Sequence, residues 1–261
     1  MTVRVLNALA LSVCSATACT ARAPGPPPPV DCAAGDAYDF LPTGQTFEPA
    51  SDGEPGWYSF GDCTVRGRNS TAVEPIEAGG RCGSTTALVL RSEGHNDWGS
   101  GFGTWEWAAA PQDATGYDGI SFWLKNPGAT EKGLRVGFGD SQTDPNGGTC
   151  VGGSDAGTGV EVPYGDAGQV CYVPFETDTD AGLPPRPDQC GNNFSRSLLT
   201  TSEWQLYLLP FDSFSQLAQP NRVDGPDLSA IHWMGFNVRK DARVELWIDD
   251  ISFYRRKPAG L

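Results

Sequence analysis

A strict two-residue alternation in the segment Gly119–Lys125 constrains the fold more than any other part of the sequence. The apolar positions are Ile120, Phe122 and Leu124, and the positions between them are Ser121, Trp123 and Lys125. Consecutive side chains of a β-strand point to opposite faces, so the first set is expected to face a core. No segment has the apolar spacing of a useful amphipathic helix, and no internal repeat occurs. The sequence therefore predicts an all-β fold.

Other short β-prone runs follow, separated by turn residues. They are residues 86–91, 101–107, 134–139, 169–175, 203–209, 232–239 and 244–254. The 33 Gly and 21 Pro residues, with only 19% charged residues, suit short strands joined by turns. Strands at this spacing predict a two-sheet antiparallel sandwich in which the outer face of one sheet is left as a shallow concave surface. One helical turn is expected at residues 214–217.

The 261 residues are enough for one large all-β domain or two small ones. We interpret residues 31–254 as a single domain and residues 255–261 as a C-terminal tail. Residues 31–83 are expected to be rich in loops. A long segment rich in Gly, Asp and Thr follows residue 140, so long loops are expected there as well.

The N-terminal residues resemble an export signal. Arg4 precedes an apolar stretch at residues 5–13, which is too short to span a bilayer. Small residues then lead to Cys19, as in the lipobox of bacterial lipoproteins, although Ala16 stands where Leu is usual. We therefore interpret residues 1–18 as a signal peptide and Cys19 as the lipid-bearing residue.

The proline-rich residues 19–30 would then form a stiff tether between the lipid and the domain. An ordinary secretory signal, cleaved near Ala18 or Ala23, is the alternative. The expected location is the outer membrane or cell surface, with a lipid anchor as the one membrane attachment, or the medium as a secreted protein. A monomer is expected.

The cysteine content supports export. Two of the 8 cysteines, Cys14 and Cys19, fall in the signal and at the anchor. The others are Cys32, Cys63, Cys82, Cys150, Cys171 and Cys190. An even set in an exported protein predicts disulfides, and we expect Cys150 to pair with Cys190, although spacing alone does not decide the pairing. The absence of a C-x-x-C motif and the presence of only 2 His argue against zinc.

The formal net charge of -14 limits the partners. A surface this acidic repels nucleic-acid phosphates and anionic lipid, so neither is expected to bind. Neutral ligands such as sugars, and divalent cations, remain as partners. The alternative is that the charge only keeps an extracellular protein soluble.

Several segments together resemble a known family. They read Gly-Tyr-Asp-Gly-Ile-Ser-Phe-Trp at residues 116–123, Trp-Gln-Leu-Tyr-Leu-Leu-Pro-Phe at 204–211, and Leu-Trp-Ile-Asp-Asp-Ile-Ser-Phe at 246–253, with residues 231–238 between the last two. In this order they resemble galactose-binding-like jelly rolls, especially family 11 carbohydrate-binding modules. The resemblance covers most of residues 47–254, with 149–190 as an insertion. It extends to Cys-containing, exported relatives of myxobacterial type.

The resemblance implies a structural Ca²⁺ held by carboxylates of the opening strand and the last strand. It assigns Glu48 from the former and Asp249 or Asp250 from the latter. Only one of the two adjacent Asp residues can face the core side, where a carboxylate needs a cation or hydrogen bonds. A surface Asp pair that ends a strand is the alternative. A second acidic group, at Asp140, Asp144 and Asn146, partly resembles a calcium-binding loop but lacks its terminal Glu, so solvated turn residues are expected there.

Sugar binding is the leading functional hypothesis, because sugars stack their C–H faces on aromatic rings and pair their hydroxyls with polar side chains. The candidates for an aromatic platform are Trp98, Trp105, Trp107 and Trp233, and their polar partners are Arg135, Gln205 and Asn237. The alternative is that tryptophans of a sandwich are core anchors. Trp57, Trp123, Trp204 and Trp247 are expected to include such anchors.

Catalysis finds little support in the sequence. No Gly-x-Ser-x-Gly elbow occurs, His95 lies in a polar loop, and His232 lies on a strand beside Trp233. We therefore expect non-catalytic polysaccharide binding by an exported, surface-anchored sandwich. A structural or adhesive surface lipoprotein that makes protein contacts is the second hypothesis, and a glycan-active enzyme is the third.

Overall fold

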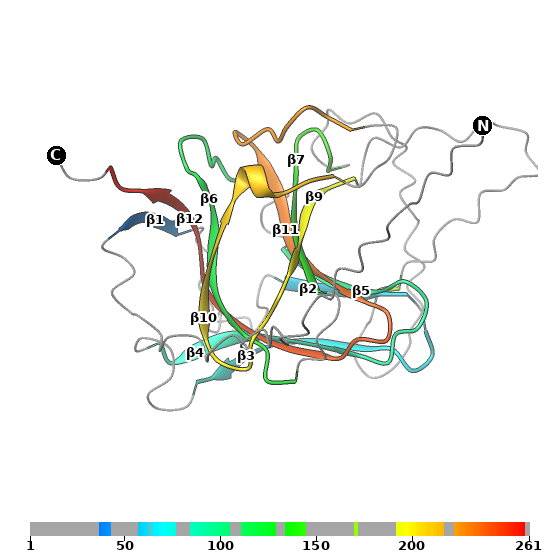
Figure 1. The fold of residues 1–261 in the computed structure, drawn as a ribbon. Helices are drawn as coiled ribbons and strands as arrows, with labels where there is room; N and C mark the ends of the chain where they lie inside the picture. Colours follow the sequence, from blue (N-terminus) through cyan, green and yellow to red (C-terminus); the bar gives the residue numbers. More distant parts are fainter. Residues whose placement is uncertain are drawn as a thin grey trace, which may run out of the picture.

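The strands of the protein form two sheets that face each other across one core (Figure 1). The computed structural model describes residues 37–42, 57–62, 64–76, 84–104, 111–128, 134–144, 170–171, 192–216 and 222–258. No helix among these residues is long and apolar enough to cross a membrane. The prediction of an all-β, two-sheet sandwich is confirmed.

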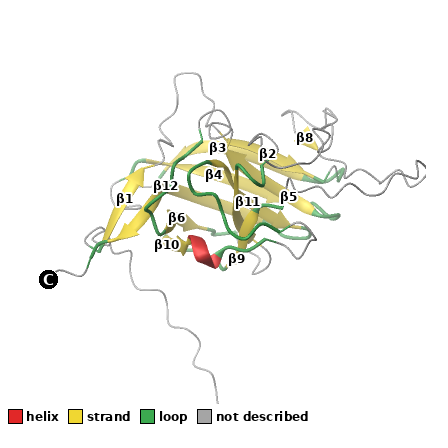
Figure 2. Cartoon of the chain, turned by 90° about the horizontal axis from the view of Figure 1, so that it is seen from above, coloured by secondary structure: helices red, strands yellow, loops and turns green. Residues whose placement is uncertain are grey.

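The first sheet is antiparallel throughout. In spatial order its strands are β10 (Gln205–Pro210), β6 (Gly119–Lys125), β12 (Val244–Arg256), β4 (Thr86–Glu93) and β3 (Arg68–Pro75). A further strand, β1 (Tyr38–Pro42), pairs with the C-terminal half of β12, and the two lie side by side in Figure 2. The last strand therefore contacts β1. The strand that the family resemblance places beside it, at Phe47 and Glu48, lies outside the described residues.

The second sheet carries the face on which the site is built. In spatial order its strands are β8 (Val170–Cys171), β2 (Trp57–Gly61), β5 (Gly99–Thr104), β11 (Ile231–Arg239), β7 (Leu134–Asp140) and β9 (Phe194–Leu198). All neighbours pair antiparallel except β2 and β8. β11 lies at the centre, so its outward side chains have neighbours on both sides.

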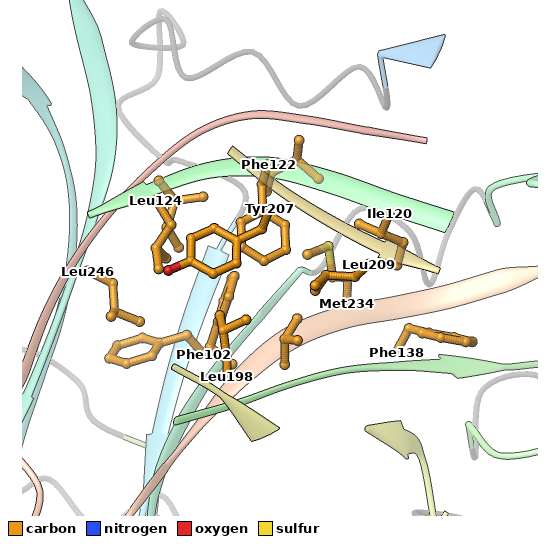
Figure 3. Close-up of a cluster of buried hydrophobic side chains, with 14 of the residues drawn as sticks. Phe102, Ile120, Phe122, Leu124, Phe138, Leu198, Tyr207, Leu209, Met234 and Leu246 are labelled. Atoms are coloured by element: carbon orange, nitrogen blue, oxygen red, sulfur yellow. The ribbon is translucent and has the colours of Figure 1, made fainter. Parts of the chain in front are cut away.

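The core lies between the sheets and follows the alternation expected from the sequence (Figure 3). From β6 and β10 it receives Ile120, Phe122, Leu124, Tyr207 and Leu209, which face Phe102, Phe138, Leu198 and Met234 of the second sheet. Phe122 is fully buried. Its ring stacks on Tyr207 at 5.6 Å and meets Phe236 edge-on at 5.4 Å. These contacts join the two sheets.

One local expectation is wrong. The helical turn lies at Phe211–Ser213, a 3-10 turn that follows Pro210, and Phe214 is already extended (φ -89°, ψ 146°) because its ring packs against Phe138. In the early region, the described residues include the strands β1, β2 and β3. The strand β3 is polar and lies at the edge of the first sheet, where the alternating apolar pattern is not required.

Candidate functional site

Glycines line the outer face of the second sheet. On the same strands, the residues that alternate with these glycines point into the core. These glycines are Gly101 and Gly103 on β5, Gly137 and Gly139 on β7, and Gly235 on β11. Their strand neighbours Phe102, Phe138 and Phe236 point inward and are fully buried. We call this surface the glycine face. Without Cβ atoms there, large side chains can lie flat against the backbone.

Aromatic side chains occupy the space that the glycines leave. A Cβ added at Gly101 would collide with the ring of Phe60, and one at Gly103 would collide with the indole nitrogen of Trp233 and approach the ring of Tyr58. Tyr58 and Phe60 have ring centroids 5.7 Å apart, and Phe60 and Trp98 have theirs 6.1 Å apart. Trp98, Phe60, Tyr58 and Trp233 therefore form an aromatic row across β2, β5 and β11.

Polar side chains lie on the part of the glycine face that β7 and β9 form. Arg135 pairs in register with Asn237 of β11 and donates from Nη2 to the Ser195 hydroxyl at 2.7 Å. The Nε of Arg135 and the Oδ1 of Asn193 are buried and have no hydrogen-bond partner. A buried polar group without a partner costs about 1–3 kcal/mol. One unpaired donor and one unpaired acceptor therefore border the glycine face.

The structure brings most of the predicted ligand residues together. Trp98, Trp233, Arg135 and Asn237 all lie on or beside the glycine face, where Trp98 is 37% exposed and Trp233 is 8% exposed. Gln205 does not join them, because it begins β10 in the first sheet. Trp105 and Trp107 lie outside the described residues.

Three residues of this face escaped the sequence analysis. Tyr58 and Phe60 lie on β2, where their alternation with the buried Trp57 could have indicated an outward aromatic pair. Asn193 precedes β9 and carries no sequence signal, because its position depends on Gly139 of the adjacent strand. These residues widen the predicted platform on both sides.

The expected tryptophan anchors fall in two environments. Trp57 is a core residue that stacks on Phe236, with centroids 6.1 Å apart. Trp123 is also buried. Trp204 and Trp247 are partly buried and receive the ammonium group of Lys125 over their rings, at 5.2 and 4.4 Å. Trp123, Trp204 and Trp247 lie in the first sheet or at its border, whereas the aromatic row lies on the second sheet.

His95 lies in a polar loop, as the sequence indicates, but its side chain is not exposed to solvent. It is 3% exposed, and its Nδ1 lies 2.8 Å from Oδ1 of Asp62. Burial alone raises the pKa of the Asp62 carboxyl, but hydrogen bonds from His95, Thr64 and the Asp97 backbone outweigh it and hold this pKa well below the ordinary value. Asp62 is therefore an anion buried beside the end of β2.

Asp140 is not a solvated turn residue either. It is fully buried at the end of β7 and accepts hydrogen bonds from the Thr143 hydroxyl at 2.9 Å and from the backbone N–H of Asp227 at 2.6 Å. Asp144 is buried as well. Asp140 therefore closes its own turn and holds the backbone of Asp227, which lies 87 residues further along the chain.

Asp249 and Asp250 differ in burial, and the core residues on either side of them are Ile248 and Ile251. Asp249 is 5% exposed and accepts the backbone N–H of Asp250 on Oδ1 at 2.8 Å, whereas Asp250 is exposed and has a left-handed φ of 49° at an irregularity of β12. A buried carboxylate oxygen suits a hard cation such as Ca²⁺. Glu48 lies outside the described residues, which contain no group of three His, Cys, Asp or Glu side chains fit for a metal.

The predicted disulfides and the lipid anchor stay predictions. Cys171 lies on β8, in the second sheet. The other residues concerned, namely Cys19, Cys32, Cys63, Cys82, Cys150 and Cys190, lie outside the described residues.

Comparison with solved structures identifies the fold. The family 11 carbohydrate-binding module of the cellulosomal cellulase Lic26A-Cel5E of Clostridium thermocellum is similar, with a TM-score of 0.50, 17% sequence identity and coverage of 86% of this chain and 97% of that chain. A family 11 module of the same organism, in complex with a β-1,3-1,4-mixed-linked tetrasaccharide, has a TM-score of 0.50, 18% identity and coverage of 85% and 98%. The chain therefore has the jelly-roll sandwich fold of carbohydrate-binding modules.

Sequence comparison adds no family assignment. No protein-family model matches the chain, and no match was found among curated proteins.

Proposed function

We propose that this protein is a non-catalytic carbohydrate-binding module and that a polysaccharide chain binds across its glycine face. The observation that carries this proposal is the aromatic row, which lies on a sheet face without other large side chains beneath it. Sugar rings present apolar C–H faces, and aromatic rings are the side chains that such faces stack on. A continuous row suits a chain of sugar units, since each unit can contact a ring.

The polar border of the same face supports the proposal. Sugar hydroxyls both donate and accept hydrogen bonds, so they can satisfy the Nε donor of Arg135 and the Oδ1 acceptor of Asn193 together. Asn237 adds an amide between this border and the aromatic row. The net charge of -14 favours a neutral polysaccharide over an acidic one.

A mixed-linked β-glucan is the first ligand to test. One module of the same fold was solved with a β-1,3-1,4-mixed-linked tetrasaccharide. Titration calorimetry with soluble mixed-linked β-glucan should show binding that Trp98→Ala and Tyr58→Ala weaken. Trp204→Ala is the matched control, because this partly buried tryptophan lies at the border of the first sheet. Equal weakening by all three variants, or no binding to any neutral glycan, would refute the proposal.

The calcium site is part of the same proposal. Asp249 and Glu48 are its proposed carboxylate ligands, with a structural role for the metal. The burial of Asp249 on the β12 strand supports it, because a buried carboxylate is stabilised by a cation. We also propose export with a lipid anchor at Cys19, for which the sequence around this residue is the support. Mass spectrometry of the mature N-terminus tests the anchor.

A further inference from the structure

One carboxylate holds the backbone on both sides of Trp98. The Oδ2 of Asp62 accepts the backbone N–H of Asp97 at 2.8 Å and that of Gly99 at 3.1 Å. The backbone N–H of Asp62 in turn donates to the Gly99 carbonyl at 3.0 Å. Trp98 is the residue between these two anchors, so Asp62 constrains the backbone from which the Trp98 side chain projects.

The second oxygen of the carboxylate is also occupied. Its Oδ1 accepts the backbone N–H of Thr64 at 3.1 Å and lies 2.8 Å from the Nδ1 of His95. The side chains of Asp62 and His95 are 0% and 3% exposed. Hydrogen bonds to a buried, charged acceptor are stronger than neutral ones, so this arrangement is rigid.

His95 connects this carboxylate to the strand that carries Phe60. Its Nε2 lies 3.1 Å from Oδ1 of Asn69, whose Nδ2 donates to the backbone carbonyl of Phe60 at 2.7 Å. A Cβ at either Gly61 or Gly67 would come within 2.5 Å of the imidazole Cε1, so the ring is tightly enclosed. The network thus joins the backbone under Phe60 to the turn that bears Trp98.

We propose that Asp62 and His95 are positioning residues for sugar binding, which hold the Trp98 ring in the aromatic row beside Phe60. This inference rests on the proposed function, since it concerns the same face. Trp98 is 37% exposed, and neither Asp62 nor His95 is accessible to a ligand. The network acts by preorganisation, because a ring already in place loses less conformational entropy when a ligand binds.

A double-mutant cycle separates this role from a general structural one. Asp62→Asn keeps the shape of the side chain but removes one acceptor oxygen and the negative charge. We expect it to weaken binding of mixed-linked β-glucan about tenfold in the otherwise unchanged protein. In a Trp98→Ala background the same change should reduce the affinity for glucan by less than about twofold. Equal losses in both backgrounds, or no loss in either, would overturn the proposal.

A readout without sugar keeps the test independent of the proposed function. The indole N–H resonance of Trp98, assigned through Trp98→Phe, should shift in Asp62→Asn, and acrylamide should quench the ring more efficiently. Asp113→Asn is the matched control, because Asp113 also accepts a backbone N–H, from Thr115 at 2.8 Å, but does not contact the turn. An unmoved Trp98 resonance would overturn the positioning role even if the protein binds no glucan.

His95→Gln covers the case in which Asp62→Asn does not fold. It leaves the bonds from Asp62 to the Trp98 turn in place and removes their support from Asn69. We expect the Trp98 indole resonance to shift less than in Asp62→Asn. The glucan affinity should lie between the affinity of the wild type and that of Trp98→Ala. A loss that persists in the Trp98→Ala background would contradict the proposal.

Discussion

Gly101→Ala tests the glycine face with a single methyl group. The added Cβ would collide with Cζ of the Phe60 ring and lie 2.7 and 2.8 Å from its Cε2 and Cε1 atoms. Carbon atoms in contact are about 3.5–4.0 Å apart, so the ring must move by about 1 Å or more. The backbone of Gly101 has no positive φ, so alanine is not strained there.

The displaced ring lies in the middle of the aromatic row, 5.7 Å from Tyr58 and 6.1 Å from Trp98. An aromatic contact is worth about 0.5–1.5 kcal/mol beyond the area that it buries. Loss of one such contact with a sugar therefore weakens binding by about two- to twelvefold. Because Phe60 also contacts both neighbours, we expect the upper end of this range.

The assay is calorimetric titration with mixed-linked β-glucan, accompanied by urea denaturation. We expect the free energy of unfolding to change by less than about 1 kcal/mol, since the contact to be relieved is a side chain. Gly225→Ala is the control, because a Cβ there meets no atom within 4 Å. Unchanged affinity in Gly101→Ala, or an equal loss in Gly225→Ala, would refute the reasoning.

Three other predictions concern stability. Because the pKa of Asp62 is lowered in the folded protein, its ionised carboxylate stabilises the fold fully above about pH 4, and this stabilisation is lost as the pH falls further. Asp62→Asn should therefore flatten the dependence of Tm on pH below about pH 5, and an unchanged profile would contradict this. A chelator should lower the Tm of the wild type but not of Asp249→Asn, and equal responses would argue against calcium at Asp249. Phe122→Ala should cost about 3–5 kcal/mol in urea denaturation, because this ring is fully buried between the sheets, and a cost under about 1 kcal/mol would contradict the core assignment.

Strand alternation carried most of the fold prediction. Ile120, Phe122 and Leu124 face the core because alternate side chains of a strand point to the same face. The edge strand β3 lacked that pattern, since its burial is only partial, and it was missed. The helical turn was misplaced because Phe214 packs against Phe138, a contact that no local sequence pattern reveals.

The site was only partly predictable because the spacing of residues in the sequence does not show to which sheet a strand belongs. Gln205 and Asn237 look alike as strand amides, yet β10 and β11 belong to different sheets. Asp140 accepts a hydrogen bond from the backbone N–H of Asp227, and His95 lies in hydrogen-bond contact with Asp62. The environments of both buried residues therefore depend on segments distant in sequence. Trp98 and Trp233 were predicted because tryptophan rings can stack on a sugar, and this reasoning did not extend to Tyr58 and Phe60 of the same row.

The central claim is that a neutral polysaccharide binds on the glycine face, and mapping the contact by NMR tests it most directly. Titration of ¹⁵N-labelled protein with mixed-linked β-glucan oligosaccharides should shift amide resonances of β2, β5, β7 and β11, together with the indole resonances of Trp98 and Trp233. Resonances of β6 and β10 should stay in place. Shifts confined to the first sheet, or no shift with any neutral oligosaccharide, would contradict the claim.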